Sequence, residues 1–255
     1  MSTLANAVDV LKLIARLRRD ITVTDAVAEL GMPKSSASRT LSMMAEYGFL
    51  ERDAVTRAYR PGAVIMEASF HFRTTTSVTS LLEEALESLV ADTGYTGYIS
   101  VLDGRDAMVV QMRTGKQLLQ VYTPPGSRGA ATANSMGRAL LARMSDQEVV
   151  ALVGRKLPDH PGHAPRTVTD LLGRLARTRS LGWSESRGEN VPHVAGVSAA
   201  VVDPGSGQAY GIGIAVPEQD VSDALLARFA VRVRDAACYV GKRIGDAYWL
   251  AFAAA

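Results

Sequence analysis

The chain has 255 residues, which at roughly 150 residues per domain predicts one large domain or two modest ones. Hydrophobic residues make up 47% and charged residues 21% of it, so a disordered chain, a collagen-like repeat and a disulfide scaffold are excluded. No stretch approaches the roughly 18 apolar residues of a membrane span, and the charged N-terminus does not resemble a signal peptide. The net charge is +2, and residues 1–60 hold this whole excess. A single cysteine, Cys238, fits a reducing compartment, so we expect a cytoplasmic protein without a membrane partner.

The first quarter of the chain has the pattern of helices followed by a hairpin. Apolar residues recur at helical spacing, and Thr22 and Asp25 form a capping arrangement before the second helix. Gly31 ends that helix, and Pro33 at a first helical position opens the next. The expected helices span residues 4–17, 22–30 and 34–47, and the expected strands span 49–52 and 58–60.

The rest of the chain mixes helical spacing with short strands joined by hairpin turns. Helices are expected over residues 63–73, 78–92, 135–144, 146–153, 168–180 and 222–246, and strands over 98–102, 107–113, 118–122, 182–186, 197–203 and 209–216. Strands joined by hairpins, with helices between and after them, predict an α+β fold with an antiparallel sheet. The polar run at residues 74–77 is the expected domain boundary.

The exposed end of the third helix has the composition of a DNA-reading surface. Small hydroxyl side chains allow close approach to bases, while basic side chains reach phosphates or guanine edges. The alternative is an ordinary solvated helix face. The residues expected to contact DNA are Lys34, Ser35, Ser36, Ser38 and Arg39 on the helix and Arg57 and Tyr59 on the hairpin.

Several sequence blocks, in order, match one family of regulators. They are VAELGMPKS (27–35), RTL (39–41), GFLERD (48–53), VLDG (101–104), GSR (126–128), MGRALLA (136–142) and VVD (201–203). With these blocks the chain resembles IclR-type transcriptional regulators over nearly its whole length. The resemblance implies a winged helix-turn-helix over residues 1–62, a linker helix over 63–76 and a GAF-like effector-binding domain over 77–255. It also implies a homodimer or a dimer of dimers on a palindromic double-stranded operator, without enzymatic activity or a cofactor.

Departures from the family pattern bear on the effector. Members that sense small oxoacids carry an acidic residue, a cysteine and two serines at the positions of Ser186, Gly196, Gly213 and Ala215. Here only one hydroxyl remains, so the expected ligand is a bulkier organic acid, an aromatic carboxylate, bound by free amides at the start of the helix near Ser135. By transfer from the family, the ligand-binding residues are Leu118, Val121, Gly129, Ser135, Met136, Ser186, Val194, Gly196, Gly213 and Ala215.

Other functions have weaker signals. His160 and His163 have ligand-like spacing but lie in a Pro/Gly loop without further ligands, so we expect no metal site. No phosphate-binding loop or nucleophile elbow is present in the sequence. Two alternatives remain: a metabolic enzyme whose N-terminal helices only mediate oligomer contacts, and a sensor that regulates a protein partner. Turnover without DNA affinity would favour the enzyme. The operator, the regulated genes and the direction of regulation stay open.

Overall fold

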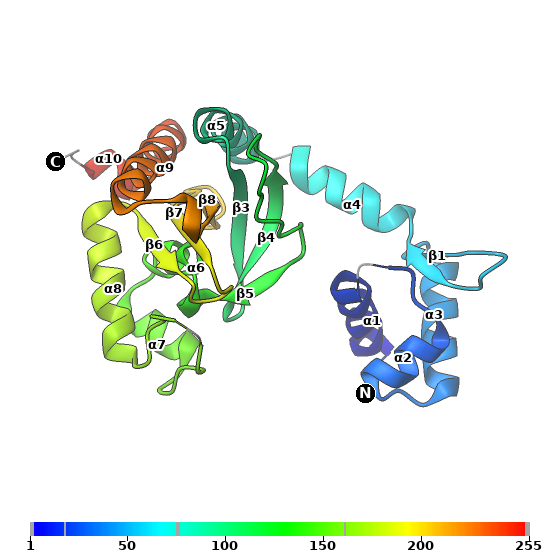
Figure 1. Cartoon of the computed structure of the whole chain (residues 1–255). Coiled ribbons are helices and arrows are strands. Elements are labelled where there is room, and N and C mark those ends of the chain that lie inside the picture. Colours follow the sequence, from blue (N-terminus) through cyan, green and yellow to red (C-terminus); the bar gives the residue numbers. More distant parts are fainter. Residues whose placement is uncertain (1–2, 18, 75–76, 161, 253–255) are drawn as a thin grey trace. The chain divides into compact units, whose positions relative to one another are not determined.

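The computed structural model describes residues 3–17, 19–74, 77–160 and 162–252 (Figure 1). The chain divides into two compact units, Met1–Ser77 and Val78–Ala255. Part of the expected boundary, residues 75–76, lies outside the described residues. Among the described helices, none combines the length and the apolar character that crossing a membrane requires.

The N-terminal unit joins a helical bundle to a small antiparallel hairpin. Its elements are α1 (Thr3–Leu17), α2 (Val23–Leu30), α3 (Lys34–Glu46), β1 (Leu50–Arg52), β2 (Tyr59–Pro61) and α4 (Ala63–Thr74). The expected capping box forms, because Thr22 Oγ1 accepts from the Asp25 amide at 3.2 Å and the Asp25 carboxylate accepts from the Thr22 amide at 2.7 Å. Gly31 ends α2 in the left-handed conformation, at φ 64°. This turn sets the direction in which α3 leaves α2.

The C-terminal unit is built on one antiparallel sheet with the strand order β5-β4-β3-β8-β7-β6. The strands are β3 (Thr96–Asp103), β4 (Asp106–Arg113), β5 (Arg128–Ala130), β6 (Ser184–Arg187), β7 (Val194–Val202) and β8 (Ala209–Pro217). The helices are α5 (Ser77–Thr93), α6 (Ser135–Leu141), α7 (Asp146–Val153), α8 (Val168–Leu181), α9 (Asp223–Ile244) and α10 (Ala247–Ala251), with short 3₁₀ turns at Ala131–Ala133 and Glu218–Asp220. The predicted α+β class with an antiparallel sheet is confirmed.

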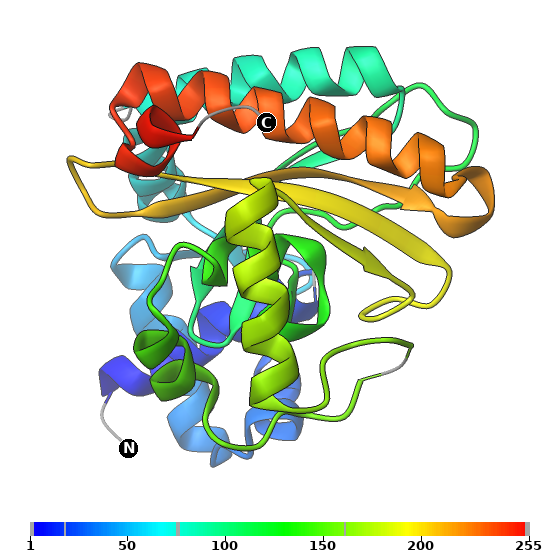
Figure 2. The same cartoon turned by 90° about the vertical axis from the view of Figure 1, so that its left-hand side faces the viewer.

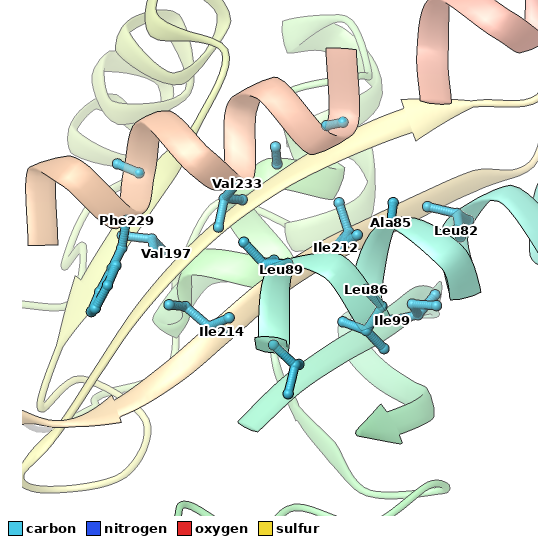
Figure 3. Close-up of a cluster of buried hydrophobic side chains, with 14 of the residues drawn as sticks. Leu82, Ala85, Leu86, Leu89, Ile99, Val197, Ile212, Ile214, Phe229 and Val233 are labelled. Carbon is cyan, nitrogen blue, oxygen red and sulfur yellow. The ribbon is translucent and has the colours of Figure 1, made fainter. Parts of the chain in front are cut away.

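One face of the sheet is covered by α5 and α9, which run along it in Figure 2. Their inward side chains meet the large residues of the strands in a single buried cluster (Figure 3). The labelled members are Leu82, Ala85, Leu86 and Leu89 on α5, Phe229 and Val233 on α9, and Ile99, Val197, Ile212 and Ile214 on the strands. This cluster is the main apolar core of the unit, and removing so much apolar surface from water is what chiefly drives the unit to fold.

The other face of the same strands carries small residues, because side chains alternate between faces. The facing pairs there are Gly196 with Ala215, Ser198 with Gly213 and Ala200 with Gly211. α6 packs directly on β7 and β8 at this patch. A Cβ at Gly211 would lie 2.4 Å from the sulfur of Met136 on α6. Because these six positions carry only small side chains or none, α6 can approach the sheet closely.

The predicted strand over 118–122 is wrong. This segment is irregular, and the edge strand beside β4 is β5. Side chains, not a strand ladder, hold the segment: the Tyr98 hydroxyl donates to the Val121 carbonyl. Pro124 and Pro125 follow after Thr123, and proline lacks the amide hydrogen that strand pairing needs.

Candidate functional site

The polar residues predicted for α3 lie on its solvent side. Lys34, Ser35, Ser38 and Arg39 are exposed and Ser36 is half-buried. The opposite side of the helix is buried in the core of the N-terminal unit. In the described part of the chain, no hydrogen bond or ion pair engages the charged groups of Lys34 and Arg39. These two cations are therefore available to an external anion.

The hairpin carries an exposed basic residue at its turn. The Asp53 carboxylate accepts from the amides of Val55 and Thr56 at 2.9 and 2.7 Å, and these bonds hold the pKa of Asp53 below its usual value. Arg57 follows in the left-handed conformation, at φ 62°, with its side chain exposed. The fixed turn thus presents Arg57 to solvent.

Tyr59 was predicted as a DNA contact, and the structure corrects this. Its side chain is 1% exposed and belongs to the core that α1, α2 and α3 form. Its amide donates to the Ile21 carbonyl at 2.7 Å, which ties the hairpin to the chain between α1 and α2. Strand alternation turns Tyr59 inward and leaves Arg60 outward. Tyr59 therefore supports the hairpin instead of facing DNA.

A cavity of about 130 Å³ lies over the small-residue patch of the sheet. Nine predicted residues line it: Val121, Gly129, Ser135, Met136, Ser186, Val194, Gly196, Gly213 and Ala215. Leu118 is the exception, since its side chain is fully exposed and does not reach the cavity. The irregular course of residues 118–122 explains why Leu118 misses it.

Several lining residues were missed by the sequence interpretation. They are Tyr98, Ser100, Ala107, Val109, Thr123, Ser127, Arg128, Asn134, Asn190, Val191, Ser198 and Ile214. Ser198 could have been found, because it lies two residues after Gly196 and so shares its face of β7. Tyr98 and Ser100 lie on a neighbouring strand, opposite Gly213 and Gly211, so only the strand pairing shows their position.

The cavity holds more hydroxyl groups than the sequence comparison indicated. Ser135 Oγ and Ser198 Oγ are 3.0 Å apart, and the Ser186 hydroxyl accepts from the Ser135 amide at 3.1 Å. Asn134 Oδ1 accepts from the Gly137 amide at 2.7 Å. The expectation of free amides at the start of α6 is therefore wrong for Ser135 and Gly137. The Ser186 hydroxyl retains its hydrogen, which it can donate into the cavity.

The charge of the cavity wall favours an anion. Among the described residues that line it, Arg128 alone has a formal charge, and none has a carboxylate. Arg128 pairs with the half-exposed Asp103 at 2.6 Å, and exposed pairs of this kind contribute little and exchange readily. Burial raises the pKa of Tyr98, so its hydroxyl stays protonated and keeps its hydrogen bond to the Val121 carbonyl.

A buried ion pair supports one wall of this cavity. The guanidinium of Arg138 on α6 lies 2.5 Å from the Glu189 carboxylate, with side-chain exposures of 2% and 5%. The same guanidinium donates to the carbonyls of Thr132 and Glu185. Burial lowers the pKa of Arg138, and Glu189 opposes that shift. The pair links α6 to the turn in which Asn190 and Val191 line the cavity.

Comparison with known protein families decides the class of this protein. Residues 71–241 match the family described as bacterial transcriptional regulator IclR, C-terminal, and residues 3–54 match the IclR helix-turn-helix domain. The chain belongs to the IclR family. As an IclR-family protein it is a DNA-binding transcriptional regulator with an effector-binding C-terminal domain, and the family is not one of enzymes.

Individual relatives agree with this assignment. The chain is 27% identical over 228 residues to the HTH-type transcriptional regulator KipR of Bacillus subtilis, covering 88% of this chain and 90% of KipR. An IclR regulator structure from Alicyclobacillus acidocaldarius matches with a TM-score of 0.83 and 18% identity, covering 94% and 97% of the two chains. An IclR homologue from Microbacterium hydrocarbonoxydans, solved in complex with 4-hydroxybenzoate, matches with a TM-score of 0.77 and 20% identity, covering 96% and 99%.

The histidines considered as metal ligands do not belong to a ligand cluster. Within residues 3–17, 19–74, 77–160 and 162–252, no three His, Cys, Asp or Glu side chains gather as a metal site would require. His163 is exposed and His160 is half-buried in the loop before α8.

The buried pair generates a stability prediction. Replacing Glu189 by alanine leaves the Arg138 charge buried without its partner, so we expect a loss of about 3–5 kcal/mol of unfolding free energy. The matched control is Asp159→Ala, which removes an exposed partner of Arg166 and should cost less than about 1 kcal/mol. Chemical denaturation followed by tryptophan fluorescence measures both losses. Similar small losses in the two variants would contradict the assigned role of Glu189.

Proposed function

We propose that a small aromatic carboxylate binds in the cavity over the sheet and changes the affinity of the helix-turn-helix for a palindromic operator. The size of the cavity is the main support. Its volume of about 130 Å³ is close to the roughly 150 Å³ of an engineered apolar cavity that admits benzene. A wall of apolar residues, glycines and hydroxyls without a carboxylate suits a ring that carries one negative charge.

The homologue from Microbacterium hydrocarbonoxydans adds independent support, since its structure holds 4-hydroxybenzoate. That molecule has the ring and the carboxylate that the size and charge of this cavity favour. We therefore choose 4-hydroxybenzoate as the probe. The proposed donors to its polar groups are the Ser186 hydroxyl and whichever of the paired Ser135 and Ser198 hydroxyls accepts from the other, with Arg128 as the cation of the wall.

The proposed DNA surface consists of the exposed side of α3 and the turn of the hairpin. Lys34, Ser35, Ser36, Ser38 and Arg39 are the proposed contacts from α3, and Arg57 is the proposed contact from the hairpin. In winged helix-turn-helix binding, the recognition helix reads base edges while the other contacts fix its register on the phosphates. Arg39 is the proposed base reader, because arginine binds guanine O6 and N7 with two hydrogen bonds.

A homodimer, or a dimer of dimers, is the proposed assembly. One module with a small positive excess offers few phosphate contacts, and two copies on a palindrome would supply the missing affinity. Exposed apolar side chains on α1 and α4 are the proposed contacts. They are Leu4 and Val8 on α1 and Val64 and Met66 on α4.

The base-reading role predicts the effect of Arg39→Ala. We expect operator affinity to fall by about 1–3 kcal/mol, with a much smaller loss on random DNA. Fluorescence anisotropy with a palindromic fragment selected from a random library measures both affinities. Arg228→Ala, which removes the same charge from α9, is the control and should change neither. Equal losses on both DNAs would make Arg39 a phosphate contact, and no loss would refute the α3 surface.

The assembly is tested by light scattering at micromolar concentration. We expect a mass of at least twice the 27.2 kDa of one chain. Val8→Asp places a charge among the proposed apolar contacts and should shift the protein towards the monomer. Val55→Asp alters an even more exposed valine on the hairpin turn and should leave the mass unchanged. A monomeric unmodified protein would refute the proposal.

The effector class is tested by filling the cavity. Ala215→Leu adds bulk at a lining position, so binding of 4-hydroxybenzoate should fall at least tenfold while operator binding without ligand is kept. Gly213 is unsuitable, because a Cβ there would lie 2.4 Å from the Val197 carbonyl and disturb the sheet itself. Ala91→Leu, on the exposed side of α5, is the control.

Calorimetry with 4-hydroxybenzoate, glyoxylate and pyruvate completes this test. Tight binding of either small oxoacid, together with no binding of benzoate-like acids, would overturn the size argument. Thermal shift gives a second readout, since a ligand at 100 times its dissociation constant adds about 2.7 kcal/mol of stability.

A further inference from the structure

A second cavity, of about 260 Å³, lies beside the first, between α8, β6 and α6. Its wall is rich in arginine. The charged or titratable lining residues are Arg138, Arg174, Arg177, Arg187, His163, Glu185 and Glu189. Trp183 also lines it, and Ser186 lines both cavities. Guanidinium groups therefore outnumber carboxylates in the wall.

The guanidinium groups of this wall differ in how firmly they are held. Arg138 is fixed by the buried Glu189. Arg174 pairs with the half-exposed Asp170 at 3.1 Å and lies 3.6 Å from Glu189. In the described structure, Arg177 is exposed and makes no ion pair or hydrogen bond. Exposed pairs contribute little to stability, so Arg174 and Arg177 can turn to an incoming anion at small cost.

Position on the helix brings these two arginines together. Residues three apart on an α-helix lie on the same side, so Arg174 and Arg177 project from neighbouring turns of α8 into one cavity. A guanidinium fork matches the oxygen geometry of a phosphate group and can bind it through paired hydrogen bonds, and this cavity has two such forks in its wall. Glu189 does not oppose this, because Arg138 neutralises it. The side chain of Glu185 is exposed to solvent.

We propose that the second cavity binds the phosphate group of a small phosphorylated metabolite, with Arg174 and Arg177 as its ligands. The volume leaves room for an organic group beyond the phosphate, against Trp183. This site is separate from the proposed effector cavity. It gives the regulator a second ligand of different chemistry.

Inorganic phosphate is the probe, titrated into the full chain at constant ionic strength and followed by calorimetry and tryptophan fluorescence. The chain has two tryptophans, and Trp249 is 1% exposed in the core, so Trp183 should carry the change. We expect saturable binding that weakens at least tenfold in Arg177→Ala and is partly kept in Arg177→Lys. Arg228→Ala should bind phosphate as the unmodified protein does.

The control arms separate this site from general salt effects and from carboxylate binding. Chloride at equal ionic strength should give no saturable change, and succinate should bind at least tenfold more weakly than phosphate. No saturable phosphate binding, an equal loss in Arg228→Ala, or tighter binding of succinate would each overturn the proposal. Circular dichroism of Arg177→Ala, whose side chain has no partner within the described chain, should show an unchanged fold.

Discussion

The close approach of α6 to the sheet is the constraint on which the effector-binding unit depends. It requires two adjacent strands to carry glycine, alanine and serine at positions 196, 198, 200, 211, 213 and 215 of one face, while the other face carries Val197, Ile212 and Ile214. The alternation of strand side chains meets both requirements with the same residues. The large side chains hold α5 and α9 on one side, and the small ones leave room for α6 and the cavity on the other. The main apolar core and the binding space thus lie on opposite faces of the sheet.

The cavity draws its walls from segments far apart in the sequence. Val121 comes from the irregular segment before β5, Ser135 from the start of α6, and Asn190 from the turn before β7. A ligand there contacts several elements at once. It can shift an equilibrium between conformations only by binding one of them more tightly. Such a difference in affinity can arise here, because the elements that form the wall can move relative to one another and change their contacts with the ligand.

Local patterns in the sequence predicted much of the fold. The capping box at Thr22 and Asp25, the stop at Gly31 and the helical spacing of α5 depend on neighbouring residues, and the structure confirms them. The strand predicted over 118–122 is wrong because Leu118, Leu119 and Tyr122 stay exposed instead of packing on the sheet, which only the fold reveals. The prediction that Tyr59 contacts DNA is wrong for a related reason. In a hairpin this short, which side chains point inward is decided by packing against the helices α1, α2 and α3.

The candidate site could also be predicted only in part, because some of its residues are brought together by the fold alone. Family positions located nine of the wall residues, because glycine and alanine at matching places indicate space. They did not locate Ser100, whose hydroxyl comes from a strand position that pairing sets opposite Gly211. Hydrogen bonds such as that from the Ser135 amide to Ser186, 51 residues apart, also depend on the folded chain.

The ion pair between Arg138 and Glu189 has a consequence that reaches beyond stability. Glu189 precedes two residues of one cavity wall and itself belongs to the wall of the other. A molecule in the second cavity that displaced this carboxylate would also shift the turn that carries Asn190 and Val191 in the wall of the first cavity. Thermodynamic linkage then makes the effect mutual, so two molecules bound in the two cavities would alter each other's affinity by the same factor. Through this one salt bridge, the response of the regulator to either proposed ligand would depend on whether the other is bound.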